Sequence, residues 1–309
     1  MRPLKKIKMN RYIKALGLLS LALIASCKKD DDVSIAPPRD YAVQYGTEKA
    51  QIEEYLNTHY IVSVNEDFDI VIDTLDADAQ ADGEVSLWNQ TEYPLQNKQV
   101  NLNNVDYTLY YLVLNQGGGE MPTRYDNVRV AYNGWTFDGN QFDYDPFPQL
   151  LFPLMNYIEG WHEIIPLFNA GVYDNTPSPD PANFTDFGAG VMFLPSDFGY
   201  YDSVRPNISS YSPLIFSFKL YQMETADTDN DGIPNKHEVG PDSIYLTDYD
   251  TDGDGNPNYN DADDDNDGYS TRDEITVTID GEEVVLPFDQ IPACDTGIKR
   301  HIDPSCHQE

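Results

Sequence analysis

Basic residues are scarce in this chain of 309 residues. Its 19 lysines and arginines stand against 53 aspartates and glutamates, which gives a formal net charge of −34. Binding to nucleic acid requires clustered basic side chains that neutralise phosphates, so this composition argues against nucleic acid as a partner. The acidity is local, because residues 227–274 hold 16 acidic residues and two basic ones. That segment needs an explanation of its own.

Long apolar runs are also lacking. Residues 15–25 are almost wholly apolar, but a membrane-spanning helix takes about 20 such residues. Six basic residues lie within residues 1–14, directly before this run. A basic region followed by a short apolar run is typical of a secretory signal peptide, and we expect one over residues 1–26.

The signal ends in Leu-Ile-Ala-Ser-Cys at residues 23–27, which resembles the lipobox of bacterial lipoproteins. In that class the cysteine, here Cys27, becomes the first mature residue and carries acyl chains that hold the protein in a membrane. An ordinary signal peptide with an incidental cysteine is the alternative. The acidic run at residues 30–32 resembles the surface-export signal of some Gram-negative lipoproteins, or it is a solvated linker. We therefore expect a lipid anchor in the outer membrane of a Gram-negative bacterium, with the protein on the cell surface or otherwise in the periplasm.

The N-terminal half has the pattern of a helix and several strands. Residues 47–59 are predicted to form a helix with Thr47 as its N-cap. Residues 68–72 alternate as a strand, and the acidic residues 73–84 are expected to form a loop. Residues 107–114 form a strong apolar strand pattern.

Alternation marks a further strand from residue 128. Val128, Val130 and Tyr132 share one strand face and should point into a core. The pair at residues 133–134, Asn-Gly, is expected to break the strand. Residues 137–140, Phe-Asp-Gly-Asn, predict a tight hairpin turn.

A second strand and a short helix should follow this turn. Residues 141–143 begin the next strand, and residues 150–154 form another extended apolar run. Residues 157–161 lead into a short helix. Pro166 should end it near Ile165, because a residue before proline disfavours helical geometry.

Four short signatures resemble those of FKBP-type peptidyl-prolyl cis–trans isomerases, in the same order and at compatible spacing. They are Tyr-Asn-Gly at 132–134, Asp-Gly-x-x-Phe-Asp at 138–143, Ile-x-Gly-Trp at 158–161 and Leu-Pro-Ser-Asp-Phe-Gly-Tyr at 194–200. The resemblance covers residues 107–222, with residues 214–220 as the last strand. It implies the α+β fold of that family, an antiparallel sheet curled around one short helix.

The resemblance also implies a pocket for a substrate proline between the sheet and the helix. Carried over position by position, the pocket residues are Tyr132, Phe142, Asp143, Leu150, Tyr157, Ile158, Trp161, Tyr200, Ile208 and Phe216. Trp161 would form its floor, Tyr200 would donate its hydroxyl to a substrate carbonyl, and Asp143 would orient the polar edge. Rotation about an X–Pro bond breaks no bond, so no cofactor is expected for catalysis.

The alternative is that these aromatic residues only fill a core, and this is our interpretation of Phe152, Phe193 and Phe218. The sequence also departs from the family pattern in loops around the pocket. Tyr201 stands where the family usually has glycine, and residues 209–210, Ser-Ser, stand where it usually has Pro-Pro. These changes bear on turnover and sequence preference more than on the fold.

Three stretches of the acidic segment fit the 12-residue calcium loop. In that loop oxygens at alternate positions converge on a hard cation, and a glycine at position six permits the sharp turn. Loop 1 spans residues 227–238, loop 2 residues 250–261 and loop 3 residues 263–274. The candidate ligands are Asp227, Asp229, Asp231, Ile233, Asn235 and Glu238 in loop 1, Asp250, Asp252, Asp254, Asn256, Asn258 and Asp261 in loop 2, and Asp263, Asp265, Asp267, Tyr269, Thr271 and Glu274 in loop 3.

The spacing of these loops narrows the class of calcium protein. They start 23 and then 13 residues apart, and the shorter step leaves no room for paired helices, which argues against EF-hand pairs and dockerins. The segment resembles thrombospondin type-3 repeats, in which the chain wraps around calcium with little other core. This implies about three structural Ca²⁺ ions and a stiffened stalk or contact surface. A disordered acidic linker is the alternative.

The C-terminal tail combines a hairpin and a cysteine pair. Residues 275–287 predict a hairpin. Outside the cytoplasm Cys294 and Cys306 are expected to form a disulfide, which would stabilise the fold by about 3 kcal/mol. His301 and His307 raise a Cys/His metal site as the alternative, although their spacing fits no usual zinc pattern.

Together these patterns predict a lipid-anchored FKBP-type isomerase that carries a calcium-binding segment and acts on X–Pro bonds of exported polypeptides. The expected parts are a signal peptide (1–26), a tether (27–45), an accessory region (46–105), an isomerase domain (106–222), calcium repeats (226–275) and a hairpin and disulfide tail (276–309). One rival is a non-catalytic chaperone or proline-peptide binder that uses the same pocket. Another is a surface adhesion or structural lipoprotein whose working part is the calcium segment.

Overall fold

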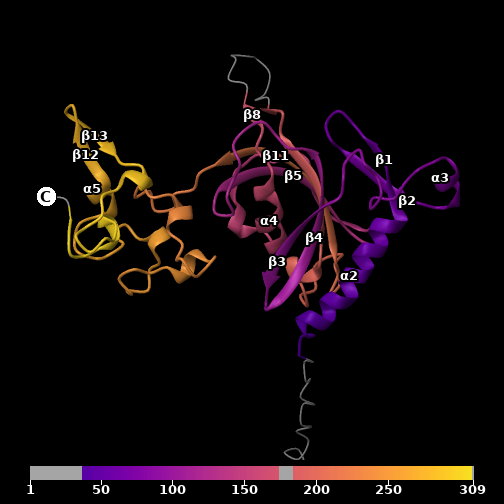
Figure 1. The fold of residues 1–309 in the computed structure, drawn as a ribbon, viewed down its shortest axis with the longest axis horizontal. Coiled ribbons are helices and arrows are strands. Elements are labelled where there is room, and N and C mark those ends of the chain that lie inside the picture. The colour runs from indigo at the N-terminus through magenta and orange to yellow at the C-terminus, as the bar shows by residue number, and fades with distance from the viewer. Residues whose placement is uncertain (1–36, 174–183, 308–309) are drawn as a thin grey trace, which may run out of the picture. The chain divides into compact units, whose positions relative to one another are not determined.

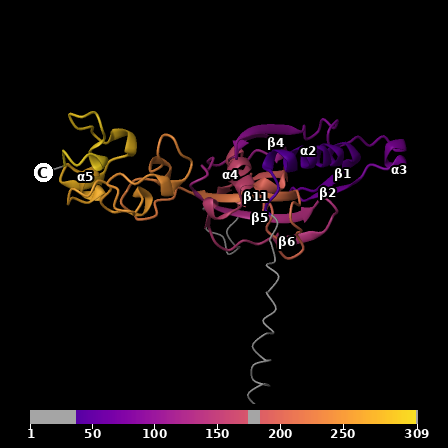
Figure 2. The ribbon, with the colours of Figure 1, turned by 90° about the horizontal axis from the view of Figure 1, so that it is seen from below.

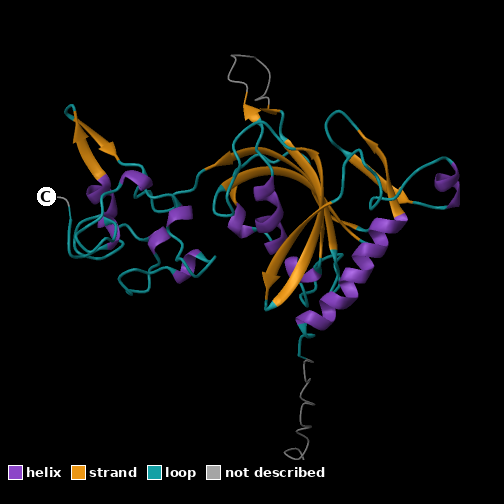
Figure 3. Ribbon diagram, in the orientation of Figure 1, coloured by secondary structure: helices purple, strands orange, loops and turns teal. Residues whose placement is uncertain are grey.

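The computed structural model describes residues 37–173 and 184–307. The expected signal peptide, Cys27 and most of the tether lie outside these residues. The main sheet has seven antiparallel strands (Figures 1 and 3). The spatial order is β3 (Gln96–Leu102), β4 (Val105–Asn115), β10 (Gly188–Leu194), β11 (Leu214–Glu224), β5 (Asn127–Thr136) and β6 (Gln141–Asp145), with β7 (Phe152–Pro153) also paired to β5.

The inner face of this sheet curls around the short helix α4 (Glu159–Ile164), as Figure 3 shows. Trp161 and Ile164 of α4 belong to the same buried core cluster as the strand residues Val128 and Val130. The shared core face predicted from the alternation of β5 is therefore confirmed. So is the fold class, an antiparallel sheet curled around a short helix and followed by an irregular C-terminal segment.

The outer face is covered by helix α2 (Tyr41–Thr58). Its apolar face packs on side chains of β4, β10 and β11 that point away from α4. The helix begins six residues before the predicted start, so the prediction of Thr47 as N-cap was wrong. The cap is Asp40, whose side chain accepts a hydrogen bond from the Val43 N–H at 3.0 Å. Residues 41–45, expected to belong to the tether, are part of this helix.

Pairing within the sheet overrides one expected break. Residues 133–134 continue β5, because Asn133 pairs with Ser217 and Gly134 pairs with Phe216 of β11. The predicted turn at residues 137–140 is confirmed, and β6 follows it. Helix α4 ends at Ile164, two residues before Pro166 and close to the predicted end near Ile165.

The accessory region is divided between a hairpin and the main sheet. Strand β1 (His59–Val64) pairs with β2 (Ile70–Thr74), which starts two residues later than predicted because Phe68 has a left-handed φ of 60°. The short helix α3 (Ala77–Ala81) lies within the predicted loop. Strand β3 pairs with β4, so the main sheet begins before the expected domain boundary at residue 106.

The C-terminal segment has little regular structure (Figure 2, orange to yellow). Its helices are short: η4 (Asn235–His237), η5 (Leu246–Asp248), η6 (Asn258–Asn260), α5 (Thr271–Ile275), η7 (Phe288–Gln290) and η8 (Arg300–Ile302). The predicted hairpin is formed by β12 (Thr276–Ile279) and β13 (Glu282–Val285). A small apolar cluster includes the buried residues Ile233, Ile275 and Ile291. Among the helices described, none has the length and apolarity to cross a membrane.

Candidate functional site

Five of the predicted pocket residues form an aromatic cluster between β5, β6, β11 and α4: Tyr132, Phe142, Tyr157, Trp161 and Phe216. The Trp161 ring is buried at the base. The Tyr132 and Phe216 rings meet it edge-on, with centroids at 5.2 and 5.5 Å, and Tyr157 stacks on it at 4.6 Å. Phe142 contacts Phe216 at 5.3 Å. Edge-to-face contacts of this kind hold rings in fixed orientations.

A glycine in β5 makes room for these rings. A Cβ atom at Gly134 would lie 2.7 Å from the Phe142 ring and 2.8 Å from the Phe216 ring. Both distances are too short for ordinary van der Waals contact. The glycine of the Tyr-Asn-Gly signature therefore has a direct packing role beside the cluster.

The cluster has one polar edge. The Tyr132 hydroxyl donates a hydrogen bond to the Asp143 carboxylate at 2.8 Å. Burial, together with this hydrogen bond, raises the pKa of Tyr132. Burial, and to a lesser degree the charge of Asp143, raises the pKa of Tyr200. Both tyrosines therefore keep their hydroxyl protons at neutral pH and can act as hydrogen-bond donors.

The remaining predicted pocket residues differ in position. Ile158, Tyr200 and Ile208 pack with the same core as the aromatic cluster. Leu150 does not, because 62% of its surface is exposed. It lies in the loop between β6 and β7, where Phe147 is also exposed, at 79%. Apolar side chains that the fold leaves uncovered here are available to a bound partner.

The three acidic loops share one backbone and hydrogen-bond geometry. In each, the carboxylate at position 1 accepts a hydrogen bond from the N–H of the glycine at position 6. These glycines are Gly232, Gly255 and Gly268, with φ between 96° and 106°. The carboxylates at positions 3 and 5 each accept an N–H from two residues further on. In every loop the oxygens of positions 1, 3 and 5 lie within 4.8 Å of one another.

Loops 1 and 3 contain buried carboxylate oxygens that no described residue pairs. Asp227, Asp229 and Asp231 each have a buried oxygen without a hydrogen-bond partner in the described chain, and so do Asp263 and Asp265. Burial raises the pKa of Asp229 to about 6 and that of Asp231 to about 7. Hard oxygen ligands in this number suit Ca²⁺, which would offset their mutual repulsion.

The residues at position 9 have a different role in the structure. The Asn235 side-chain oxygen accepts a hydrogen bond from the Thr228 N–H at 3.0 Å, and Asn258 does the same for Thr251 at 2.9 Å. These amides brace the loop by joining position 9 to position 2. A ligand role for Asn235, Asn258 and Thr271 stays a prediction.

This chain is similar to several known proteins. The 22 kDa FKBP-type peptidyl-prolyl cis–trans isomerase of Escherichia coli is 33% identical over 100 residues, which cover 32% of this chain and 48% of that protein. A probable FKBP-type isomerase, FkpA, of Neisseria meningitidis is 30% identical, over 37% of this chain and 38% of that protein. This chain has FKBP-type relatives. It spans less than half the length of the curated relatives it matches.

Two further comparisons complete this result. A crystal structure of a peptidyl-prolyl cis–trans isomerase from Pseudomonas syringae aligns with a TM-score of 0.36 and 16% identity, over 61% of this chain and 99% of that one. A family model described as BamM C-terminal matches residues 228–301. It therefore covers nearly all of the acidic loops together with the hairpin and much of the tail.

Tyr201, where the FKBP-type pattern usually has glycine, adopts the left-handed conformation that favours glycine, with φ at 47°. Its ring lies 4.7 Å from that of Tyr41 and 5.1 Å from that of Tyr211. Its hydroxyl donates a hydrogen bond to the Arg39 carbonyl at 2.5 Å. A left-handed tyrosine costs about 1–2 kcal/mol. The contacts with Arg39 and Tyr41 at the start of α2 and with Tyr211 offset that cost.

Sequence reasoning missed a buried carboxylate behind the site. Glu48 of α2 is 1% exposed and accepts hydrogen bonds from the N–H and hydroxyl of Ser196. Ser196 lies four residues before Tyr200. The sequence shows only that a polar residue stands in a predicted helix, and it does not show that Glu48 is buried. Its partner Ser196 lies 148 residues away in the sequence.

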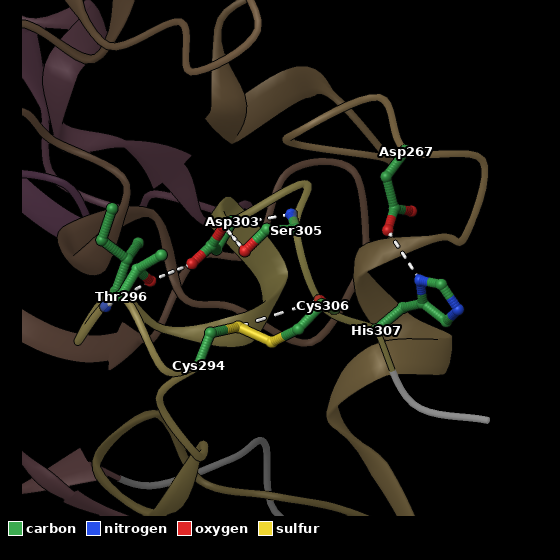
Figure 4. The surroundings of a disulfide bond; sticks show 8 residues. Asp267, Cys294, Thr296, Asp303, Ser305, Cys306 and His307 are labelled. Carbon is green, nitrogen blue, oxygen red and sulfur yellow. Dashed lines mark hydrogen bonds and ion pairs between the residues drawn. A yellow bond between two sulfur atoms is a disulfide. The ribbon is translucent and has the colours of Figure 1, made fainter.

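The C-terminal tail lies against loop 3. Cys294 and Cys306 form a disulfide with Cα atoms 6.1 Å apart. His307, the next residue, contacts the Asp267 carboxylate through its Nδ1 at 3.2 Å (Figure 4). Because both cysteines are in the disulfide, they offer no thiolate ligands, and the alternative Cys/His metal site was wrong.

Proposed function

We propose that this protein is an FKBP-type peptidyl-prolyl cis–trans isomerase that acts on X–Pro bonds of exported polypeptides. The observation that carries the proposal is the aromatic cluster on Trp161 with the Tyr132–Asp143 pair at its edge. The isomerase relatives, at 30–33% identity over 100 and 122 residues, support it.

The chemistry asked of such a site is modest. Rotation about an X–Pro bond faces a barrier of ~18–20 kcal/mol from amide resonance and takes tens of seconds unaided. The twisted amide has lost part of its charge separation. An apolar surface of aromatic rings therefore favours it over the planar amide, which water solvates better.

The polar edge would position the substrate backbone relative to the aromatic cluster. Tyr200 keeps its proton at neutral pH and would donate a hydrogen bond to a substrate carbonyl. Asp143 is held by the Tyr132 hydroxyl and would orient the backbone beside the proline. A contact that strengthens as the amide twists accelerates the reaction about tenfold for each 1.4 kcal/mol.

The exposed apolar loop between β6 and β7 suits a polypeptide substrate. Phe147 and Leu150 of this loop are exposed at 79 and 62%, and Tyr144 of the adjoining strand β6 is exposed at 58%. They would contact residues that flank the proline in an unfolded chain. We infer that the substrates are flexible polypeptides rather than small molecules.

A protease-coupled assay on an X–Pro peptide tests the activity. The wild-type protein should speed cis–trans exchange well above the spontaneous rate, and Phe142→Ala should reduce kcat/KM about tenfold or more. Phe152→Ala is the matched control. The interpretation of Phe152 as a core residue was wrong, because it is 47% exposed in β7 and lies outside the aromatic cluster. Phe152→Ala should keep wild-type activity.

Two results would count against the proposal. Wild-type protein that leaves exchange at the spontaneous rate would exclude the enzyme. If it still bound proline peptides, the non-catalytic chaperone would be the function of this domain. Equal loss in Phe142→Ala and Phe152→Ala would place the activity away from the aromatic cluster.

We propose in addition that loops 1–3 bind about three structural Ca²⁺ ions, as in thrombospondin type-3 repeats. The carboxylates at positions 1, 3 and 5 would hold them, and bound calcium would supply charge neutralisation and rigidity. After metal is removed with a chelator, calorimetric titration with Ca²⁺ should detect this binding. The substitution Asp229→Asn should weaken it. If the protein binds no calcium, the proposal of a calcium-stiffened stalk or adhesion surface is rejected.

The cellular location is a further proposal. We propose that Cys27 carries lipid and that the protein is anchored in the outer membrane. Cys27→Ser should abolish incorporation of labelled fatty acid and release the protein into the soluble fraction. Protease added to intact cells would degrade a surface-exposed protein and spare a periplasmic one. Unlabelled wild-type protein would exclude the lipoprotein.

A further inference from the structure

Three buried carboxylates from two different loops converge in the C-terminal segment. Asp231 and Glu238 belong to loop 1, and Asp264 belongs to loop 3. One oxygen of each lies within 4.8 Å of the others. Their exposed fractions are 3, 1 and 2%. Like charges held this close and this deeply buried repel one another strongly without a counter-charge.

Five oxygens of this group have no hydrogen-bond partner among the described residues. They are one oxygen of Asp231 and both oxygens of Glu238 and of Asp264. Buried polar atoms in folded proteins are nearly always paired, so five unpaired oxygens in one place indicate a missing positive partner. Arg272 does not fill that role through a hydrogen bond, because its Nη1 donates to the Asn230 carbonyl at 3.0 Å.

Asp264 occupies a position where the other loops carry threonine. At position 2 of loops 1 and 2, Thr228 and Thr251 are tied to the asparagine at position 9. In loop 3 the Asp264 N–H makes the same backbone contact with position 9, because it donates to the Thr271 hydroxyl at 3.1 Å. The Asp264 carboxylate has no hydrogen-bond partner among the described residues. One of its oxygens lies within 4.8 Å of oxygens of Asp231 and Glu238 in loop 1.

We propose that Asp264 is a ligand of the loop 1 cation, so that one divalent ion cross-links loop 1 to loop 3. This inference rests on the proposed calcium binding and deepens it. Asp231 belongs both to this group and to the group of positions 1, 3 and 5 of loop 1. The site therefore draws on Asp227, Asp229, Asp231, Glu238 and Asp264. Five carboxylates and no nitrogen or sulfur ligand favour Ca²⁺ over a transition metal.

The cross-link is tested by removing metal from the full-length mature chain with a chelator and then titrating the chain with CaCl₂. Asp264→Asn should remove one calcium from the stoichiometry seen by native mass spectrometry, or weaken that step about tenfold or more in calorimetry. Asp273→Asn is the matched control, since Asp273 is an exposed acidic residue of loop 3. It makes the same change of charge and should bind calcium as the wild type does.

Thermal unfolding gives a second readout that separates a ligand from a structural residue. Without calcium, Asp264→Asn should raise the melting temperature, because it removes an unpaired buried charge. With calcium, the same substitution should lower the melting temperature, because the cross-link is weakened. A residue with only a packing role would lower both, and that result would overturn the proposal.

The outcomes distinguish this inference from the proposed function. Wild-type protein that binds calcium, together with Asp264→Asn binding of unchanged stoichiometry and affinity, would overturn the cross-link and leave calcium binding intact. Wild-type protein that binds no calcium would overturn both.

Discussion

The carboxylate of Glu48 accepts two hydrogen bonds from Ser196, one from its backbone N–H at 2.8 Å and one from its hydroxyl at 2.5 Å. Gln44 donates a third to the same carboxylate at 2.6 Å. This contact fastens helix α2 to the turn that precedes Tyr200. The N-terminal helix is therefore part of what positions the proposed site.

Glu48→Gln should destabilise the fold by about 1–3 kcal/mol. The amide has only one acceptor oxygen, so either the N–H or the hydroxyl of Ser196 loses its partner in a buried place. Chemical denaturation measures the change. Asp40→Asn offers a control on the same helix, because asparagine also caps well and should cost little. Equal, small effects from both variants would contradict the role given to Glu48.

The same residue predicts a pH dependence. Burial is the main cause that raises the pKa of Glu48 above its ordinary value, so the folded state binds this proton more tightly than the unfolded chain does. Its contribution to stability is full below about pH 4.3 and is lost as the pH rises through the folded pKa. The stability difference between wild type and Glu48→Gln should therefore shrink from acidic to neutral pH. If the stability difference instead grows from acidic to neutral pH, the pKa of Glu48 is lowered in the folded protein.

Gly134→Ala should impair the proposed site. Its Cβ would push the rings of Phe142 and Phe216 apart, at a cost of about 1–3 kcal/mol in stability and about tenfold in activity. Gly46→Ala in α2 is the matched control, because a Cβ there meets nothing within 4 Å. In that helix it should stabilise by about 0.5–1 kcal/mol with unchanged activity. Full activity in Gly134→Ala would remove the packing role of this glycine.

Tyr201→Gly should destabilise the protein although it relieves the left-handed strain. It removes two aromatic contacts, each worth about 0.5–1.5 kcal/mol, and a hydrogen bond worth about 1 kcal/mol. Tyr201→Phe removes only the hydrogen bond and should cost about 1 kcal/mol. Urea denaturation of both variants separates these effects. A more stable Tyr201→Gly would show that strain outweighs the contacts.

Chelation should loosen the C-terminal segment and leave the main sheet folded. Each calcium present at 100 times its dissociation constant stabilises the bound form by about 2.7 kcal/mol. Limited proteolysis with EDTA should cut within residues 227–275 before it cuts the sheet. Cleavage at equal rates with and without EDTA would show that the acidic loops do not depend on a metal.

Local patterns in the sequence predicted the parts of the fold that local forces decide. The alternation of Val128 and Val130, the turn at residues 137–140 and the glycines at position six of the loops were all readable. The continuation of β5 through Gly134 was not, because it depends on pairing with β11, 82 residues away in the case of Phe216. Cross-strand pairing overrides the local preference of Asn-Gly for a turn.

The candidate site shows the same division. Trp161 and Phe142 were identified from short signatures, and the structure brings them together with Phe216. Glu48 and Asp264 were not identified, because each acts on a residue in another segment. Their burial became visible only in the folded chain. Leu150 was assigned to the pocket from the sequence, but in the structure it lies exposed in a loop.

Exchange NMR on a proline peptide at equilibrium tests the central claim most directly. Catalytic amounts of the wild-type protein should produce cis–trans exchange peaks on a timescale far shorter than the tens of seconds of the unaided reaction, and Phe142→Ala should lose most of this effect while Phe152→Ala keeps it. A peptide that exchanges at the unaided rate in the presence of folded wild-type protein would contradict the account.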